Sequence, residues 1–122
     1  MTALVTREDQ NGICILSLNR PEALNALSPA MFIELRDHVD QLEEQTDEVG
    51  CVILRGNGRS FSAGNDLKAI QAGERAPSQH FQAETLDAIE TLPQPVIAAV
   101  QGHCYTGALE VVLACDLLIA AA

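Results

Sequence analysis

Two glycine-bearing loops and one glutamate are the parts of this chain best suited to chemistry. Residues 56–66 and residues 101–107 each follow a short apolar run and lead into a helical pattern. Glycine lets the backbone approach a ligand closely, and the first amides of a helix have no partner within that helix, so both loops can donate hydrogen bonds to an anion. Glu110 lies about one helical turn after Gly107 on the same face and supplies an acid or a base. This combination predicts chemistry at a carbonyl, whose oxygen gains negative charge during the reaction.

Other loop motifs fit the chain less well. Gly56-Asn-Gly58 begins like a dinucleotide-binding fingerprint, but Phe61 occupies the position of its last glycine, and no Gly-Lys-Ser/Thr of a phosphate loop is present. Ser62 with Gly64 resembles part of a nucleophile elbow, yet Ser60 stands two residues before Ser62. A serine hydrolase is therefore the less favoured alternative.

The front of the chain predicts a hairpin followed by a helix. Two β-type runs, residues 4–8 and 13–18, flank Asn11-Gly12, the dipeptide that most readily adopts a tight hairpin turn. Ser28 is then an N-cap residue followed by proline, which predicts a helix running to about residue 46.

Alternating apolar runs and helical patterns in the rest of the chain predict a parallel sheet. The strand at residues 52–54 is expected to be buried on both faces. The other expected elements are helix 66–72, a helix that Ser78 caps and that ends before Pro93, strand 96–100, helix 107–114 and strand 117–120. The last strand is also expected to be buried, and because nothing follows it to cover the sheet, we interpret the chain as the front part of a larger protein.

Composition and charge narrow the range of partners. The chain has 122 residues, 48% of them hydrophobic, which predicts one globular domain, and its formal net charge of −10 argues against nucleic acid or an anionic membrane as a partner. The four cysteines are far apart and lack metal-ligand spacing, so we expect reduced thiols and no metal site. The first residues lack a signal-peptide pattern, which predicts a cytoplasmic protein.

Three segments together closely resemble the enoyl-CoA hydratase/isomerase, or crotonase, family. They are Leu18-Asn-Arg-Pro-Glu-Ala-Leu-Asn-Ala-Leu27, Arg59-Ser-Phe-Ser-Ala-Gly-Asn-Asp-Leu67, and Pro95-Val-Ile-Ala-Ala-Val-Gln-Gly102 followed by Gly107 and Glu110. The resemblance covers essentially the whole chain. It implies an α/β fold, a crotonase-like (ClpP/crotonase) spiral of β-β-α units that is incomplete at the C-terminus, with residues 1–122 as the N-terminal part of an acyl-CoA-binding domain.

The resemblance also implies a site and a reaction. The amides of Asn65 and Gly107 would hold the oxygen of a thioester enolate, and Glu110 would be the first of two glutamates that add water to a trans-2-enoyl-CoA, the second lying beyond Ala122. No separate cofactor is implied, because coenzyme A is part of the acyl-CoA substrate, and a homo-oligomer (trimer or hexamer) is expected for the full-length protein. The implied substrate-binding positions are Ala23, Leu24, Ala63, Gly64, Asn65, Asp66, Leu67, Lys68 and Gly107.

Several alternatives stay open within this resemblance. An enoyl-CoA isomerase, an acyl-CoA hydrolase and a truncated, non-catalytic fragment all fit the same motifs. Thr106-Gly107-Ala108 stands where many members have three glycines, which leaves the shape of the acyl pocket open. Lys68 and Arg20 are candidates for a coenzyme A phosphate or are ordinary solvated cations.

Overall fold

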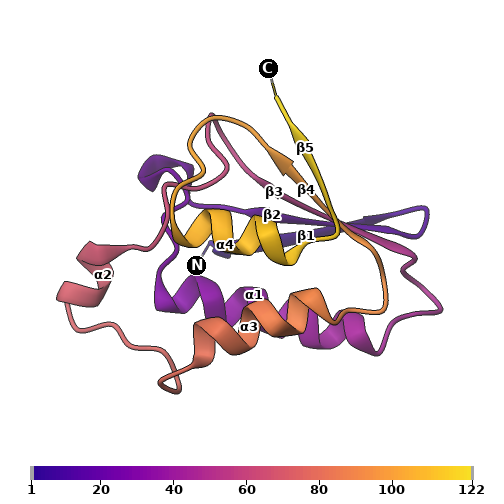
Figure 1. Ribbon diagram of the computed structural model, residues 1–122, viewed down its shortest axis with the longest axis horizontal. Coiled ribbons are helices and arrows are strands. Elements are labelled where there is room, and N and C mark those ends of the chain that lie inside the picture. The colour runs from indigo at the N-terminus through magenta and orange to yellow at the C-terminus, as the bar shows by residue number, and fades with distance from the viewer. Residues whose placement is uncertain (1, 122) are drawn as a thin grey trace.

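The chain folds into a mixed five-stranded sheet whose helices lie together on one side (Figure 1). The computed structural model describes residues 2–121. The strands follow one another across the sheet in chain order, with β1 antiparallel to β2 and all later neighbours parallel. Their bounds are β1 Val5–Gln10, β2 Ile13–Leu18, β3 Cys51–Gly56, β4 Val96–Val100 and β5 Leu117–Ala120. The helices are η1 Pro21–Ala23, α1 Pro29–Glu43, α2 Leu67–Gln71, α3 Phe81–Glu90 and α4 Gly107–Ala114.

The predicted hairpin is confirmed in its turn and its register. Asn11 and Gly12 take φ angles of 53° and 81°, the left-handed backbone that a two-residue turn of this type needs. The strands pair from Val5 opposite Leu18 to Gln10 opposite Ile13. The turn therefore fixes which side chains of β2 face the helices.

The cap of α1 is also where the sequence predicts it. The Ser28 hydroxyl accepts a hydrogen bond of 3.1 Å from the Met31 amide. The helix ends at Glu43 instead of near residue 46, because the Glu44 and Gln45 amides bond three residues back and tighten the last turn. Its buried stripe consists of Met31, Phe32, Leu35, Val39 and Leu42.

The cap predicted for α3 is wrong. The helix begins at Phe81, its N-cap position is His80, and no side chain caps it. Ser78 contributes only its backbone carbonyl, which accepts a 3.4 Å hydrogen bond from the Phe81 amide. The helix is held instead by its buried side, where Thr85 and Ile89 are almost fully covered.

The sheet buries one face more completely than the other. Val52 and Leu54 are about 1% exposed, whereas Ile53 between them is half-buried, so the prediction of a strand covered on both faces holds on the helix side only. The prediction that β5 is buried is wrong, since Leu117, Leu118 and Ile119 are 56–63% exposed. Within residues 2–121, only β4 makes extensive contact with β5, along one edge.

None of the helices in residues 2–121 is long and apolar enough to cross a lipid bilayer.

Two serine substitutions test the assignment of helix caps. Ser28→Ala should lower the free energy of unfolding by about 1 kcal/mol, because the Met31 amide loses its acceptor. Ser78→Ala is the matched control and should change it by less than about 0.5 kcal/mol. Urea unfolding of both variants measures the difference, and equal effects would show that the cap of α1 adds no stability.

Candidate active site

Three loops meet at the carboxyl ends of neighbouring parallel strands. The front loop (residues 19–28) follows β2, the first glycine loop (residues 56–66) includes the last residue of β3, and the second glycine loop (residues 101–107) follows β4. Figure 1 shows them gathered at the same end of the sheet. In open sheets of this kind, ligands bind outside the carboxyl ends of the strands.

The two glycine loops run side by side and are hydrogen-bonded to each other. The Phe61 amide donates to the Gln101 carbonyl over 2.7 Å, and the Ser62 amide donates to the His103 carbonyl over 3.0 Å. Further along, Gly64 has a φ of 97°, and a side chain there would lie 2.7 Å from the Thr106 hydroxyl. The close approach and the backbone conformation both require glycine at position 64.

Asn25 joins the front loop to the first glycine loop, although sequence reasoning gave it no role. Its side-chain amide is fully buried and donates to the carbonyls of Asn57 and Ser60 over 2.8 and 3.0 Å. Its side-chain oxygen accepts from the Arg20 amide over 2.7 Å. The one sequence signal was the place of Asn25 in the first of the family-like segments.

Among the residues that the structure describes, the amide of Asn65 has no protein acceptor. Leu27 bridges to the first glycine loop by donating to the Gly64 carbonyl and accepting from the Asp66 amide, at 2.8 and 3.0 Å. Leu27 therefore bonds to the residues on either side of Asn65 and leaves the Asn65 amide without a bond. The amide of Gly107, at the first position of α4, is also unused, so within residues 2–121 neither of the two predicted oxyanion donors bonds to the protein.

These two residues lie against each other. Gly107 is buried, and a Cβ added to it would collide with Oδ1 of Asn65. The Asn65 side chain in turn exchanges long hydrogen bonds of 3.4–3.5 Å with the Gln82 side-chain amide. The first glycine loop, the start of α4 and the first turn of α3 therefore meet at Asn65.

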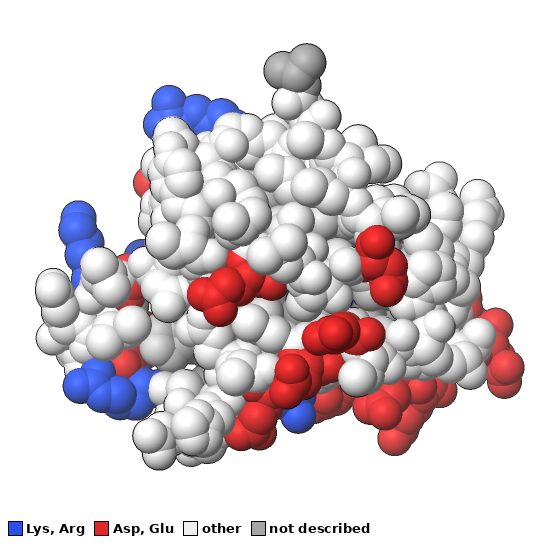
Figure 2. Space-filling view, in the orientation of Figure 1, with Lys and Arg blue, Asp and Glu red and all other residues white. Residues whose placement is uncertain are grey.

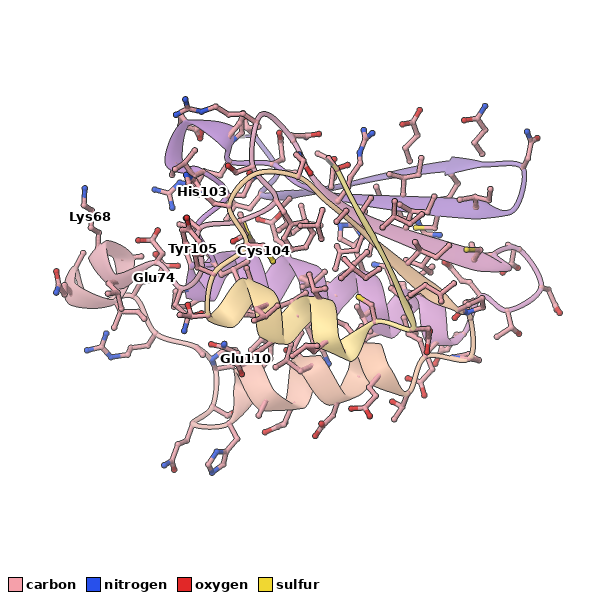
Figure 3. All side chains as sticks on the ribbon, turned by 45° about the horizontal axis from the view of Figure 1, so that its top comes forward. Lys68, Glu74, His103, Cys104, Tyr105 and Glu110 are labelled. Carbon is pink, nitrogen blue, oxygen red and sulfur yellow. The ribbon has the colours of Figure 1, made fainter. Side chains whose placement is uncertain are left out.

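Glu110 projects from the first turn of α4 (Figure 3) and is exposed. Its amide donates to the Thr106 carbonyl over 3.0 Å, as the predicted helix requires, while its carboxylate bonds to nothing within residues 2–121. Thr106 itself has a φ of 42°, an unusual conformation for a β-branched residue. The side chain of Glu110 is thus available to a ligand, although it lines neither of the cavities described next.

Two cavities adjoin Asn65. A groove of about 890 Å³ is lined by residues of the front loop and the start of α2. It is named the polar groove because five charged side chains line it, and its lining includes six of the predicted binding positions: Ala23, Leu24, Asn65, Asp66, Leu67 and Lys68. A second cavity, of about 520 Å³, is named the apolar cavity after the side chains of Leu27, Pro29, Phe32, Ile70 and Phe81, although polar side chains such as Arg75, Gln79 and Gln82 also line it. Asn65 and Glu74 line both, so they stand between the two cavities.

The remaining predicted binding positions are Ala63, Gly64 and Gly107. The Ala63 amide donates to the Leu24 carbonyl over 2.9 Å, and the Gly64 amide donates to the Ser62 hydroxyl over 3.2 Å. Together with Gly107, they line neither cavity. The amides of Ala63 and Gly64 are thus used within the loops, whereas the amide of the next residue, Asn65, is not.

Asp66 is the structural anchor of the groove. Its carboxylate caps α2 by accepting from the Ala69 amide over 3.0 Å and pairs with Arg20 over 2.6 Å. Burial raises the pKa of Asp66, but these hydrogen bonds lower it more, so the pKa lies below its ordinary value. Because Arg20 is engaged in this pair, Lys68 is the groove-lining cation without an ion-pair partner among residues 2–121.

The charge is unevenly distributed on the visible face of the molecule. Figure 2 shows Asp and Glu gathered over the lower helices, while most Lys and Arg lie toward the end from which α2 projects. This basic end is the one at which Lys68 and the polar groove lie (Figure 3). The lining of the groove itself is mixed, with two cations, Arg20 and Lys68, against three carboxylates, Glu22, Asp66 and Glu74.

Burial makes three of the four cysteines poor nucleophiles. All four are free, and burial raises the pKa of Cys14 to about 11 and that of Cys115 to about 12. Burial also raises the pKa of Cys104, in the second glycine loop. A protonated thiol is a poor nucleophile, so these three groups are not candidate nucleophiles.

The geometry matches a known family. The sequence profile described as "Enoyl-CoA hydratase/isomerase" matches residues 8–122, and the chain belongs to this family. A mitochondrial enoyl-CoA hydratase of Pongo abelii is 34% identical over 93% of the chain, and an ethylmalonyl-CoA decarboxylase of Bos taurus is 37% identical over 90% of it. The crystal structure of an enoyl-CoA hydratase from Bacillus anthracis superposes with a TM-score of 0.85 at 36% identity over 97% of the chain. The fold is therefore the crotonase fold predicted from the sequence.

The chain is shorter than these proteins. It spans 39% of the Pongo hydratase, 37% of the Bos decarboxylase and 47% of the Bacillus structure. The relatives also carry names of different reactions, hydration and decarboxylation among them. Family membership thus defines the scaffold, whereas the reaction depends on the groups at the site.

The Arg20–Asp66 pair predicts a pH-dependent stability. Asp66→Asn should lower the free energy of unfolding at neutral pH by about 1 kcal/mol, since it removes the ion pair with Arg20, while the Asn oxygen can still cap α2. A carboxylate whose pKa folding lowers stabilises the fold above its unfolded pKa of about 3.9, and this stabilisation is lost as the pH falls through the folded pKa.

The gap in unfolding free energy between parent and Asp66→Asn should therefore shrink as the pH falls from about 5 to about 3. Urea unfolding across this range measures it. Asp87→Asn, an exposed change on α3, is the control and should show no such trend. A gap that stays constant or widens would show that Asp66 is not stabilised as a carboxylate.

Proposed function

We propose that the protein containing this chain is an enoyl-CoA hydratase that adds water to a trans-2-enoyl-CoA. The observation that carries the proposal is the pair of unused amides, Asn65 and Gly107, on two loops that are hydrogen-bonded to each other. A thioester oxygen that accepts from both would be stabilised as negative charge develops on it. Backbone donors held in this way need no reorganisation during the reaction.

The two cavities suggest how the substrate lies. Asn65 borders both of them, so the thioester would sit beside it, with coenzyme A in the polar groove and the acyl group in the apolar cavity. Lys68 would meet a phosphate, and the loop residues Ala23 and Leu24 would contact the pantetheine part. Arg20 would act indirectly, by holding Asp66.

Glu110 would transfer the proton or activate the water. It lies one helical turn from Gly107, and it is exposed without a hydrogen-bond partner in residues 2–121. A second acid or base opposite Glu110, outside this chain, is expected for hydration. Isomerisation or hydrolysis of the thioester would use the same two amides with different proton transfers. The expected oligomer, a trimer or hexamer, and the expected cytoplasmic location stay predictions.

Glu110→Gln tests the acid-base role. In the full-length protein it should lower kcat for hydration of crotonyl-CoA by about 10²- to 10⁴-fold, because an amide cannot exchange the proton. Coenzyme A binding should be unchanged. Loss of the conjugated thioester absorbance gives the rate, calorimetry gives the affinity, and Glu90→Gln at the exposed end of α3 is the control. An unchanged kcat would remove Glu110 from the mechanism.

Gly107→Ala tests the oxyanion site. The added methyl would collide with the Asn65 side chain and displace one or both amides, so kcat should fall by about 10²- to 10³-fold. Gly50→Ala is the matched control, because its methyl would have its nearest neighbour at 4.0 Å. If both variants fold, by circular dichroism, and retain the parent's kcat, the amide pair is not the catalytic feature.

A further inference from the structure

An arm projects from the body of the molecule beside the proposed site. It consists of residues 67–80, which include α2 and the loop that leads to α3, and Figure 1 shows it standing away from the sheet. Most of its residues are exposed. Yet the arm supplies Ile70, Glu74 and Pro77 to the apolar cavity, so its position determines the shape of that cavity.

Within residues 2–121, Glu74 is the one side chain that joins the arm to the body by a hydrogen bond. Its carboxylate accepts a 2.7 Å hydrogen bond from the Ala30 amide, at the start of α1. Every other hydrogen bond of residues 67–80 in the described chain has its partner within residues 66–84; Arg75, for example, donates to the carbonyls of Ile70 and Glu74. Figure 3 shows Glu74 between α2 and the body.

The contact suits a carboxylate. Pro29 has no amide hydrogen and Ser28 occupies the Met31 amide, which leaves the Ala30 amide as the free donor of the first turn of α1. The helix dipole adds a favourable interaction with negative charge at this end. On the arm side, Gly73 precedes Glu74 with a φ of 100° and open space around it, so the backbone can pivot there.

We propose that Glu74 is a latch that holds the arm against α1 and thereby limits the length of the acyl group that the apolar cavity accepts. Released from Ala30, the arm moves outward and the cavity opens at the wall that Glu74 shares with the polar groove. Glu74 is a positioning residue and takes no part in the chemistry. The inference rests on the proposed function, because it takes the apolar cavity as the acyl site.

Kinetics of the full-length protein with two thioesters test the latch. In Glu74→Ala, kcat/KM for trans-2-dodecenoyl-CoA relative to crotonyl-CoA should rise by about tenfold, the discrimination that one methylene gives in an apolar pocket. Glu74→Gln keeps an oxygen that can accept from Ala30 and should retain the parent ratio. Glu90→Ala, which removes the same charge from the exposed end of α3, should also retain it. An unchanged ratio in Glu74→Ala, or a ratio in Glu74→Gln that rises equally, would overturn the proposal.

Limited proteolysis separates failure of the latch from failure of the proposed reaction. Trypsin cleaves after Lys68 and Arg75 within the arm, and this cleavage should accelerate in Glu74→Ala but not in the other two variants. If the parent hydrates neither thioester, the proposed function fails. The difference in cleavage rate between the parent and Glu74→Ala then tests by itself whether Glu74 holds the arm. Equal rates in the parent and Glu74→Ala would overturn the latch.

Discussion

The hydrogen bonds between the two glycine loops are the constraint on which the site depends. The parallel register of β3 and β4 brings Arg55 beside Ala99, so the segments that follow leave the sheet together. Their backbones then pair at two points, where Phe61 donates to Gln101 and Ser62 donates to His103. Each such bond contributes only about 1 kcal/mol of net stability. Their larger effect is to fix the direction of the amides that remain unused.

Polar side chains are buried among the loops beside the apolar Phe61 and Leu27. Asn25, Ser60 and Ser62 are buried, and each bonds to backbone groups of a neighbouring loop. Asp66 and Arg20 close the cluster on the side of the groove. Buried polar groups whose hydrogen bonds are all made favour a single conformation. This cluster therefore makes the three loops rigid.

The sequence predicted the features that local signals determine and missed those that depend on distant contacts. The Asn11-Gly12 turn, the Ser28 cap and the bounds of α4 follow from neighbouring residues. The exposure of β5 depends on what packs over it, and the contact between Glu74 and Ala30 joins positions 44 apart. Family resemblance named six residues of the groove, but the roles of Asn25 and Glu74 needed coordinates, because each bonds to backbone groups that are more than 30 positions away in the sequence.

Thr106 shows that the start of α4 is not arranged for greatest stability. Its φ of 42° is a conformation that costs a non-glycine residue about 1–3 kcal/mol, and its side chain provides no cap. The conformation precedes Gly107 and sets the direction in which that amide points. Selection for thermal stability alone would favour glycine at this position. The more flexible backbone would then hold the Gly107 amide less firmly in the direction of the proposed thioester oxygen. Heat resistance and turnover would then be in conflict at a single peptide unit.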